Sequence, residues 1–265
     1  MQAVAAARYG CAPHQVVVAP GTQALLQWLP RLFPADRVAI AGPTYGGHAS
    51  AWQAAGAQIV DNGAAHAVVV NPNNPDGRRT SLAELRARAE GLTLLVVDEA
   101  FADFDAESLA TDPPPHTIVL RSFGKTYGLA GARLGFAIAR EGMAARLREA
   151  LGPWAVGGPT LAIGRAALAD TGWLNAASAR LTADGEWLDA RLVEVGFAIA
   201  GATPLFRLAA RADASRAFRR LGENGILVRP FAYRPDWLRF GVPRAQHRAR
   251  VAAALQAAGP TSSAS

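Results

Sequence analysis

The sequence predicts an α/β protein with a mostly parallel central sheet, flanking helices and a smaller C-terminal α+β domain. Short β-rich apolar runs alternate with helix-like stretches, which is the pattern of βα units around a parallel sheet. The chain has 265 residues and is 51% hydrophobic, so it can bury a sizeable core. Gly and Pro become frequent over residues 151–160, and longer helices followed by new strands come after them.

The elements follow from these patterns in chain order. Six apolar runs are predicted strands of the large domain: QVVVA, RVAIA, AVVVN, TLLVVD, TIVLRS and LGFAIA. Between them, residues 22–29, 45–55 and 81–90 are predicted helices. Ser81 and Glu84 have the spacing of a capping box, which indicates a helix start. The predicted strands of the second domain are LFRLAA, ILVRPF and WLRFG.

We therefore expect a large domain over residues 8–150, a small domain over residues 151–257 and a disordered tail over residues 258–265. A single cysteine, Cys11, excludes an internal disulfide framework and suits a reducing cytoplasm. No apolar run is long enough to span a bilayer, so we expect a soluble cytoplasmic protein without a membrane partner.

The formal charge of +6 and the pI near 10.4 raise the question of nucleic-acid binding. Such binding needs basic groups gathered on one face, and here they are spread along the chain without an aromatic platform. We expect no nucleic-acid partner and no bound metal. An acidic or phosphorylated small substrate would also suit a basic protein.

Polar residues follow four of the predicted strands, and ligands of open α/β sheets bind beyond such carboxyl ends. After QVVVA, Gly21 permits a tight turn, and the amides of Thr22 and Gln23 start a helix that can receive a phosphate. After AVVV comes the rigid turn NPNNPDG, in which Asn74 offers an amide donor. Taken alone, each of these features is also explained by ordinary turn chemistry.

The other two strand ends carry charges. Asp98 ends TLLVVD, and a carboxylate there is costly to bury without a cation or strong donor. After TIVL, Ser122 and Lys125 come together, and Arg133 follows as a possible phosphate ligand. Lys125 is the only lysine in the chain, whereas the other basic residues are arginines. Of these basic side chains, only the lysine amine can form a Schiff base with an aldehyde. Taken alone, a single lysine can also be left by chance in a sequence that favours arginine.

Together these groups meet the needs of pyridoxal phosphate. That cofactor requires an amine for its aldehyde, a carboxylate for its ring nitrogen, a donor for its phenolic oxygen and a cationic cup for its phosphate. Lys125, Asp98 and Asn74 fill the first three roles. The Gly21 turn, Ser122 and Arg133 form the cup.

An ATPase is the rival interpretation, because LLVVDEA is similar to a Walker B strand and GKT to the end of a Walker A loop. A P-loop, however, has glycine at the position that Val119 occupies here. A Walker A loop also usually precedes its acidic strand. The sequence therefore disfavours an ATPase.

Five motifs in order carry a family resemblance: APGTQALLQWL, GPTYGGH, NPNNPDG, VVDEAFADF and RSFGKTYGLAGARLGF. With them the chain resembles the class I/II aminotransferases, which are pyridoxal phosphate enzymes of fold type I. DEAFADF and RSFGKTYGLAG are most similar to the cobalamin-pathway branch, the L-threonine-O-3-phosphate decarboxylases. Histidinol-phosphate aminotransferases come next.

The resemblance implies a role for each site residue. Lys125 binds the cofactor covalently, Asp98 pairs with the pyridinium nitrogen, Asn74 donates to the phenolic oxygen and Tyr45 stacks on the ring. The cofactor phosphate is expected at Thr22, Gln23, Ser122 and Arg133. Arg239, in WLRFGVP, matches the arginine that clamps the substrate carboxylate. The resemblance also implies a homodimer.

Three features depart from the family pattern. Phe101 stands where many relatives have tyrosine, so one donor to the phenolic oxygen is missing. Gly124 stands where a second serine is common. Relatives usually carry an additional N-terminal segment that closes the substrate pocket, and we expect that this segment is missing before Met1.

The motifs leave the reaction open, because decarboxylation and transamination use the same residues. The first hypothesis is decarboxylation of L-threonine O-3-phosphate to (R)-1-aminopropan-2-yl phosphate in cobalamin biosynthesis. The second is transamination of a phosphorylated or other amino acid, as in histidinol-phosphate aminotransferases. The third is an inactive or non-enzymatic homologue that kept the fold.

Overall fold

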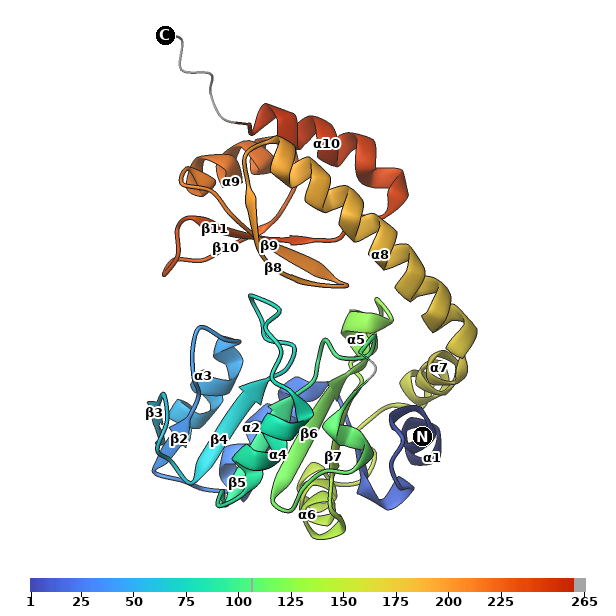
Figure 1. The fold of residues 1–265 in the computed structure, drawn as a ribbon. Helices are drawn as coiled ribbons and strands as arrows, with labels where there is room; N and C mark the ends of the chain where they lie inside the picture. The colour runs from blue at the N-terminus through green and yellow to red at the C-terminus, as the bar shows by residue number, and fades with distance from the viewer. Residues whose placement is uncertain (106, 260–265) are drawn as a thin grey trace. The chain divides into compact units, whose positions relative to one another are not determined.

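The computed structural model describes residues 1–105 and 107–259, and Figure 1 shows their arrangement. These residues form two compact units. Unit 1 comprises Met1–Asn74 and Arg78–Thr171, and unit 2 comprises Pro75–Gly77 and the chain from Gly172 onward. Each unit has its own sheet and its own core.

The sheet of unit 1 has seven strands in the order β1-β7-β6-β5-β4-β2-β3. The central strands are parallel, whereas β7 runs antiparallel to both of its neighbours. The mostly parallel α/β fold predicted from the sequence is confirmed. The strands are β1 (Val16–Ala19), β2 (Arg37–Ala39), β3 (Gln58–Val60), β4 (His66–Val70), β5 (Leu94–Asp98), β6 (Thr117–Ser122) and β7 (Gly135–Ala139).

Helices cover both faces of this sheet (Figure 1). Strand β5 shows why, because Leu94 and Val96 face one core and Leu95 and Val97 the other, so its first four residues are all apolar. One face packs against α2 (Thr22–Leu32), α3 (Gly46–Ala54) and α6 (Glu141–Leu151). The other packs against α1 (Gln2–Tyr9), α4 (Leu82–Ala89) and α7 (Gly158–Ala169).

Helix α4 begins as its sequence predicts. Ser81 is the N-cap, and its hydroxyl oxygen accepts a hydrogen bond from the Glu84 backbone N–H at 3.2 Å. The short helix α5 (Phe123–Thr126) follows β6 directly. Single 3₁₀ turns lie at Pro13–Gln15, Leu109–Thr111, Ala130–Ala132 and Ala245–His247.

Unit 2 consists of a four-stranded antiparallel sheet in the order β10-β11-β9-β8, packed against helices. Its strands are β8 (Ala198–Thr203), β9 (Phe206–Ala210), β10 (Arg229–Pro230) and β11 (Trp237–Gly241). Its helices are α9 (Ala214–Glu223), α10 (Arg248–Ala257) and most of α8 (Thr171–Glu194). A smaller C-terminal α+β part is thus present.

The boundary between the two units falls after Thr171, later in the chain than the Gly/Pro-rich stretch at residues 151–160 predicts. Helix α7 belongs to unit 1, because Leu168 is buried in the same core as Ala5 of α1. At the other end, Ala258 is 2% exposed, and its carbonyl oxygen accepts a hydrogen bond from Arg211 at 2.7 Å. The predicted disordered tail therefore cannot begin at Ala258, and its residues 260–265 lie outside the described residues.

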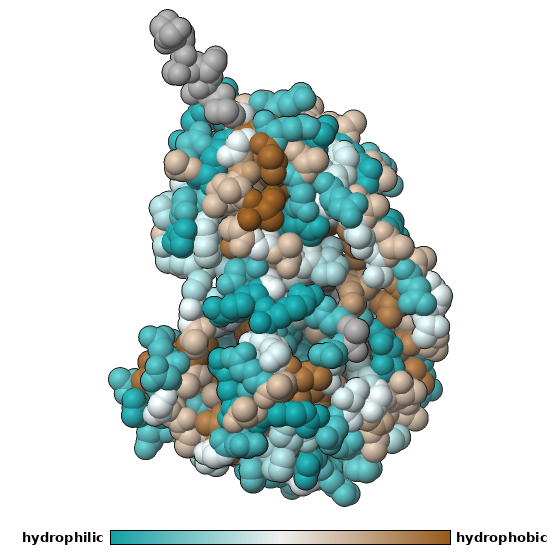
Figure 2. Space-filling model, viewed as in Figure 1, coloured by the Kyte–Doolittle hydropathy of each residue, from teal (hydrophilic) through white to brown (hydrophobic). Residues whose placement is uncertain are grey.

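Hydrophilic residues predominate on the face seen in Figure 2, with small scattered hydrophobic patches. Within residues 1–105 and 107–259, none of the helices combines the length and the apolar character that crossing a bilayer requires.

Candidate active site

A cavity of about 270 Å³ in unit 1 brings together eight of the nine predicted site residues. Seven of them come at or after the carboxyl ends of strands, and Arg133 comes just before β7, which runs antiparallel to its neighbours, so all eight gather at one edge of the sheet. The eight are Thr22, Gln23, Tyr45, Asn74, Asp98, Ser122, Lys125 and Arg133. The ninth, Arg239, lies on β11 of unit 2.

One end of the cavity is built to hold an anion. Gly21 has φ +82°, and a Cβ added there would lie 2.6 Å from Nη2 of Arg133. Glycine thus lets the guanidinium approach the start of α2, where Thr22 and Gln23 lie in the first turn, whose amides have no partner within the helix. The positive end of the helix dipole adds to the arginine charge. The Ser122 hydroxyl also lines this cavity.

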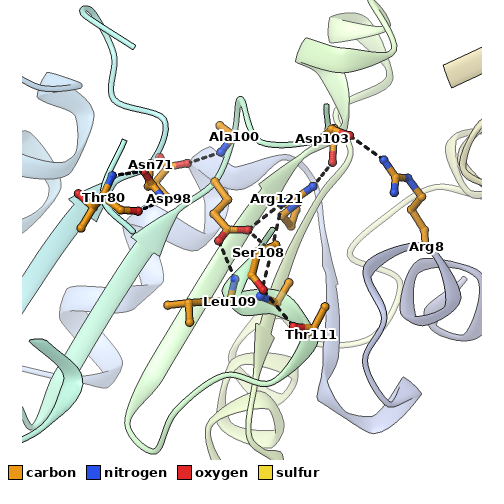
Figure 3. Close-up of polar contacts among 12 residues, drawn as sticks. Arg8, Asn71, Thr80, Asp98, Ala100, Asp103, Ser108, Leu109, Thr111 and Arg121 are labelled. Atoms are coloured by element: carbon orange, nitrogen blue, oxygen red, sulfur yellow. Dashed lines mark hydrogen bonds and ion pairs between the residues drawn. The ribbon is translucent and has the colours of Figure 1, made fainter. Parts of the chain in front are cut away.

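Asp98 is held at the end of β5 by two hydrogen bonds. Its side chain is 6% exposed, and Oδ2 lies 2.7 Å from Nε2 of His48. Oδ1 accepts the Ala100 backbone N–H at 3.0 Å, a bond drawn in Figure 3. A buried carboxylate needs such partners, so the site is arranged to keep Asp98 in one orientation.

The sequence analysis missed His48. It lies three residues after Tyr45 at the start of α3, and its side chain is 1% exposed. Residues three apart share a helix face, so the position of His48 in GPTYGGH was the available signal. The partner of His48, which is Asp98 at the end of β5, could not be predicted from that spacing.

Two aromatic residues, Tyr45 and Phe101, line the cavity. The Tyr45 ring meets the His48 ring edge-on, with centroids 6.0 Å apart, and Tyr45 Oη lies 3.4 Å from Gln23 Oε1. A Cβ at Gly47 would lie 2.5 Å from Tyr45 Cε1, so this glycine makes room for the ring. Nζ of Lys125 lies 5.7 Å from the centroid of the Phe101 ring. A planar ligand thus has flat apolar surfaces available.

A buried ion cluster supports the turn after Asp98. Nη1 of Arg121 donates to Oε2 of Glu99 at 2.7 Å, and Nη2 donates to Asp103. All three side chains are at most 3% exposed. Figure 3 shows Arg121 pointing toward Asp103 and Ser108. Arg121 on β6 therefore ties down the turn that carries Ala100 and Phe101, a contact that the sequence analysis did not predict.

These residues fit pyridoxal 5'-phosphate by the chemistry of their donor set. A primary amine, a buried carboxylate, an amide and a cationic cup line one cavity, and two glycines keep space open there. Those are the groups that the aldehyde, ring nitrogen, phenolic oxygen and phosphate of the cofactor require. Among the described residues, no group of His, Cys, Asp and Glu is arranged to hold a metal ion.

Comparison with known proteins identifies one family. The family described as "Aminotransferase class I and II" matches residues 5–66 and 61–257. A threonine-phosphate decarboxylase of Sinorhizobium sp is 45% identical over 254 residues, covering 89% of this chain and 75% of the relative. One of Pseudomonas aeruginosa is 38% identical over 272 residues, covering 96% of this chain and 81% of the relative.

An aminotransferase is also among the similar proteins. A histidinol-phosphate aminotransferase of Symbiobacterium thermophilum is 33% identical over 257 residues, covering 86% of this chain and 71% of the relative. The solved histidinol-phosphate aminotransferase of Sinorhizobium meliloti, in complex with pyridoxal-5'-phosphate, superimposes with a TM-score of 0.88 at 24% identity. That match covers 97% of this chain and 80% of the solved one.

Proposed function

The chain belongs to the class I and II aminotransferase family, and from this membership we propose that it decarboxylates L-threonine O-3-phosphate. The product is (R)-1-aminopropan-2-yl phosphate, a step of cobalamin biosynthesis. The observation that carries the proposal is the 45% and 38% identity to two threonine-phosphate decarboxylases over most of the chain. The cofactor is pyridoxal 5'-phosphate.

Each polar residue of the cavity has a separate proposed role. Lys125 Nζ would hold the cofactor covalently, and its amine would also hold the proton that is delivered to Cα. Asp98, oriented by His48, pairs with the ring nitrogen. Asn74 donates to the phenolic oxygen. When bound, the cofactor supplies a sink for the electron pair left on Cα as carbon dioxide departs.

The remaining proposed contacts position the cofactor and the substrate. The amides of Thr22 and Gln23, the Ser122 hydroxyl and the Arg133 guanidinium hold the cofactor phosphate. Tyr45 stacks on the cofactor ring. Arg239 clamps the substrate carboxylate through its planar fork.

Two arginines of unit 2 favour a negatively charged substrate. Arg229 and Arg239 are directly opposed on the antiparallel strands β10 and β11. Burial, and then the charge of Arg229, lower the pKa of Arg239. Two guanidinium groups at opposed strand positions offer several N–H donors and positive charge to an anion. A phosphorylated amino acid carries two anionic groups. The sequence analysis did not single out Arg229.

Two assays on one preparation test the reaction. We expect carbon dioxide release from L-threonine O-3-phosphate and no amino transfer from it to 2-oxoglutarate. The reverse result would support the alternative, an aminotransferase of the histidinol-phosphate type, which the 33% identical relative favours.

Two substitutions of Lys125 test its covalent role. Lys125→Arg keeps the cation but cannot bind an aldehyde covalently, so we expect it to lose the visible absorption band of the bound cofactor, as does Lys125→Ala. A wild-type chain without that band would favour the third hypothesis, a non-enzymatic homologue.

We also propose that the protein is a cytoplasmic homodimer that acts on a small molecule rather than on nucleic acid. Trp154 of unit 1 is 93% exposed, and aromatic residues are enriched at protein interfaces. Sedimentation of the purified protein tests this. A monomer at micromolar concentration would contradict it.

A further inference from the structure

Two segments of unit 1 carry residues that line the cavity. Residues 40–45, the Tyr45 loop, connect β2 to α3, and residues 71–74, the Asn74 turn, follow β4. Strands β2 and β4 are parallel neighbours, so the segments that follow them leave the same edge of the sheet side by side. Tyr45 and Asn74 both line the cavity. Their relative position is therefore set by the contacts that join the two segments.

One side chain of the Asn74 turn joins it to the Tyr45 loop. Asn73 is 2% exposed. Its Nδ2 donates to the Pro43 carbonyl oxygen at 3.0 Å, and its Oδ1 accepts the Thr44 hydroxyl at 2.6 Å. A primary amide has both a donor and an acceptor, and here they contact two consecutive residues. The amide thus joins the segments at the residues that directly precede Tyr45 and Asn74.

The main chain around Asn73 is itself held in place. Its backbone N–H donates to the Arg78 carbonyl at 2.8 Å, and the Asn71 backbone N–H donates to the Asp98 carbonyl at 2.8 Å. The Asn71 side chain exchanges two hydrogen bonds with Thr80, as Figure 3 shows. Every residue in these contacts, and in those of the Asn73 side chain, belongs to unit 1. The Asn74 turn is thus a fixed support for the other segment.

The backbone holds the Tyr45 loop at its two ends. The N–H of Ile40 donates to the Val60 carbonyl at 2.8 Å, and the N–H of His48 donates to the Tyr45 carbonyl at 3.3 Å. The Asn73 side chain holds the middle of the loop. Because a buried amide is costly unless its donor and acceptor are bonded, these two bonds favour one arrangement of the loop against the turn.

We propose that Asn73 is a positioning residue whose side-chain amide couples the Tyr45 loop to the Asn74 turn, so that the stacking ring and the donor to the phenolic oxygen meet one cofactor together. This rests on the proposed function, because it assigns those two contacts to Tyr45 and Asn74. Asn73 acts through the main chain of the two segments. A change in the Tyr45 loop should therefore be felt at the phenolic oxygen.

Asn73→Leu tests the coupling, because leucine has a similar size but makes neither bond. We expect it to raise the pH midpoint of the absorption change of the bound cofactor by about 1 unit, as loss of one hydrogen bond to a charged oxygen would. Asn224→Leu is the matched control, since it removes an exposed asparagine that donates to the Arg220 carbonyl at 2.8 Å in unit 2. The control should leave the midpoint unchanged. A folded Asn73→Leu protein with the wild-type midpoint would overturn the proposal.

Thr44→Val tests the coupling from the other segment, because it removes only the hydroxyl that Asn73 accepts. We expect a smaller upward shift of the midpoint, and no shift when the same change is made in an Asn74→Ala background. Thr182→Val, which removes an exposed hydroxyl bond on α8, is its control. An equal shift in both backgrounds would mean that Asn74 does not carry the effect and would overturn the proposal. If Asn73→Leu does not fold, this cycle decides.

Amide hydrogen exchange gives a measurement that needs no cofactor. The backbone amides of Thr44 and Tyr45 should exchange faster in Asn73→Leu than in Asn224→Leu, while those of β5 should not change. A wild-type chain that binds no cofactor would contradict the proposed function. The exchange comparison would still decide whether Asn73 joins the two segments, since unchanged exchange at Thr44 and Tyr45 would overturn that contact.

Discussion

Phe101 leaves Asn74 as the proposed donor to the phenolic oxygen on this side of the cavity. Its ring lines the cavity and lies near Lys125. We predict that Phe101→Tyr, which adds a hydroxyl, lowers the pH midpoint of the absorption change of the bound cofactor by about 1–2 units, because a donor stabilises the charged oxygen. Absorbance against pH measures it. An unchanged or higher midpoint would show that the hydroxyl does not reach the oxygen.

Arg229 tests whether the substrate carries a second anionic group. Removing one charge-assisted hydrogen bond costs about 1.5–3 kcal/mol, so we predict that Arg229→Gln raises KM for L-threonine O-3-phosphate about 10- to 100-fold. The variant should also raise the pKa of Arg239, because Arg229 is one cause of its lowering. Arg220→Gln, at an exposed ion pair of α9, is the control. Equal KM values for the two variants would remove Arg229 from the site.

Strands β5 and β6 are joined at their carboxyl ends by Arg121. Burial alone would lower its pKa, but Asp103 and Glu99 outweigh that and raise it above its ordinary value. We predict that Arg121→Met, which leaves two buried carboxylates unpaired, lowers the free energy of unfolding by about 3–5 kcal/mol.

The exposed i,i+4 pair of Arg88 and Glu84 on α4 gives the comparison. Arg88→Met should change the free energy of unfolding by less than about 1 kcal/mol. Urea unfolding monitored by circular dichroism measures both variants. Similar values for the two would mean that the cluster adds nothing to the stability of the turn.

Strand β4 begins with a buried histidine that makes stability depend on pH. His66 is 7% exposed and packs edge-on against Trp52, with ring centroids 5.9 Å apart. Burial lowers its pKa from the ordinary 6.5. The unfolded chain therefore takes up a proton first, so the stability that neutral His66 confers is present above pH 6.5 and is lost as the pH falls through the lower folded value.

We predict that His66→Phe, which keeps a ring against Trp52, weakens this loss. The free energy of unfolding, measured between about pH 7.5 and pH 5, should fall less steeply in the variant than in the wild type. A steeper fall in the variant would reverse the sign assigned to His66.

In the molecule as a whole, the two units have separate cores, so damage to one need not spread to the other. Leu238 of β11 is 1% exposed in the core of unit 2. We predict that Leu238→Ala destabilises unit 2 by about 2–5 kcal/mol. Amide exchange should speed up in β9 and β11 while it stays slow in β5 and β6. Equal acceleration in both sheets would indicate that the units unfold together.

Local pattern was enough to predict the α/β class and several of the residues that line the cavity, whereas Tyr45 was predicted only from the family resemblance. Alternating apolar runs and turn residues specify strands and helices over a few residues each. A parallel sheet then gathers the carboxyl ends of its strands, so Asn74, Asp98 and Lys125 could be assigned to one site before any coordinates. The strands β3 and β8 were missed, because short or glycine-containing runs give little period-two signal.

Contacts between distant segments required the tertiary structure. The His48 contact to Asp98, the Arg121 cluster and the opposition of Arg229 to Arg239 each join residues that no spacing relates. The end of unit 1 after α7 rather than before it likewise depends on what α7 buries against α1. Such pairings depend on strand register and on which faces are buried, both of which arise only when the whole chain packs.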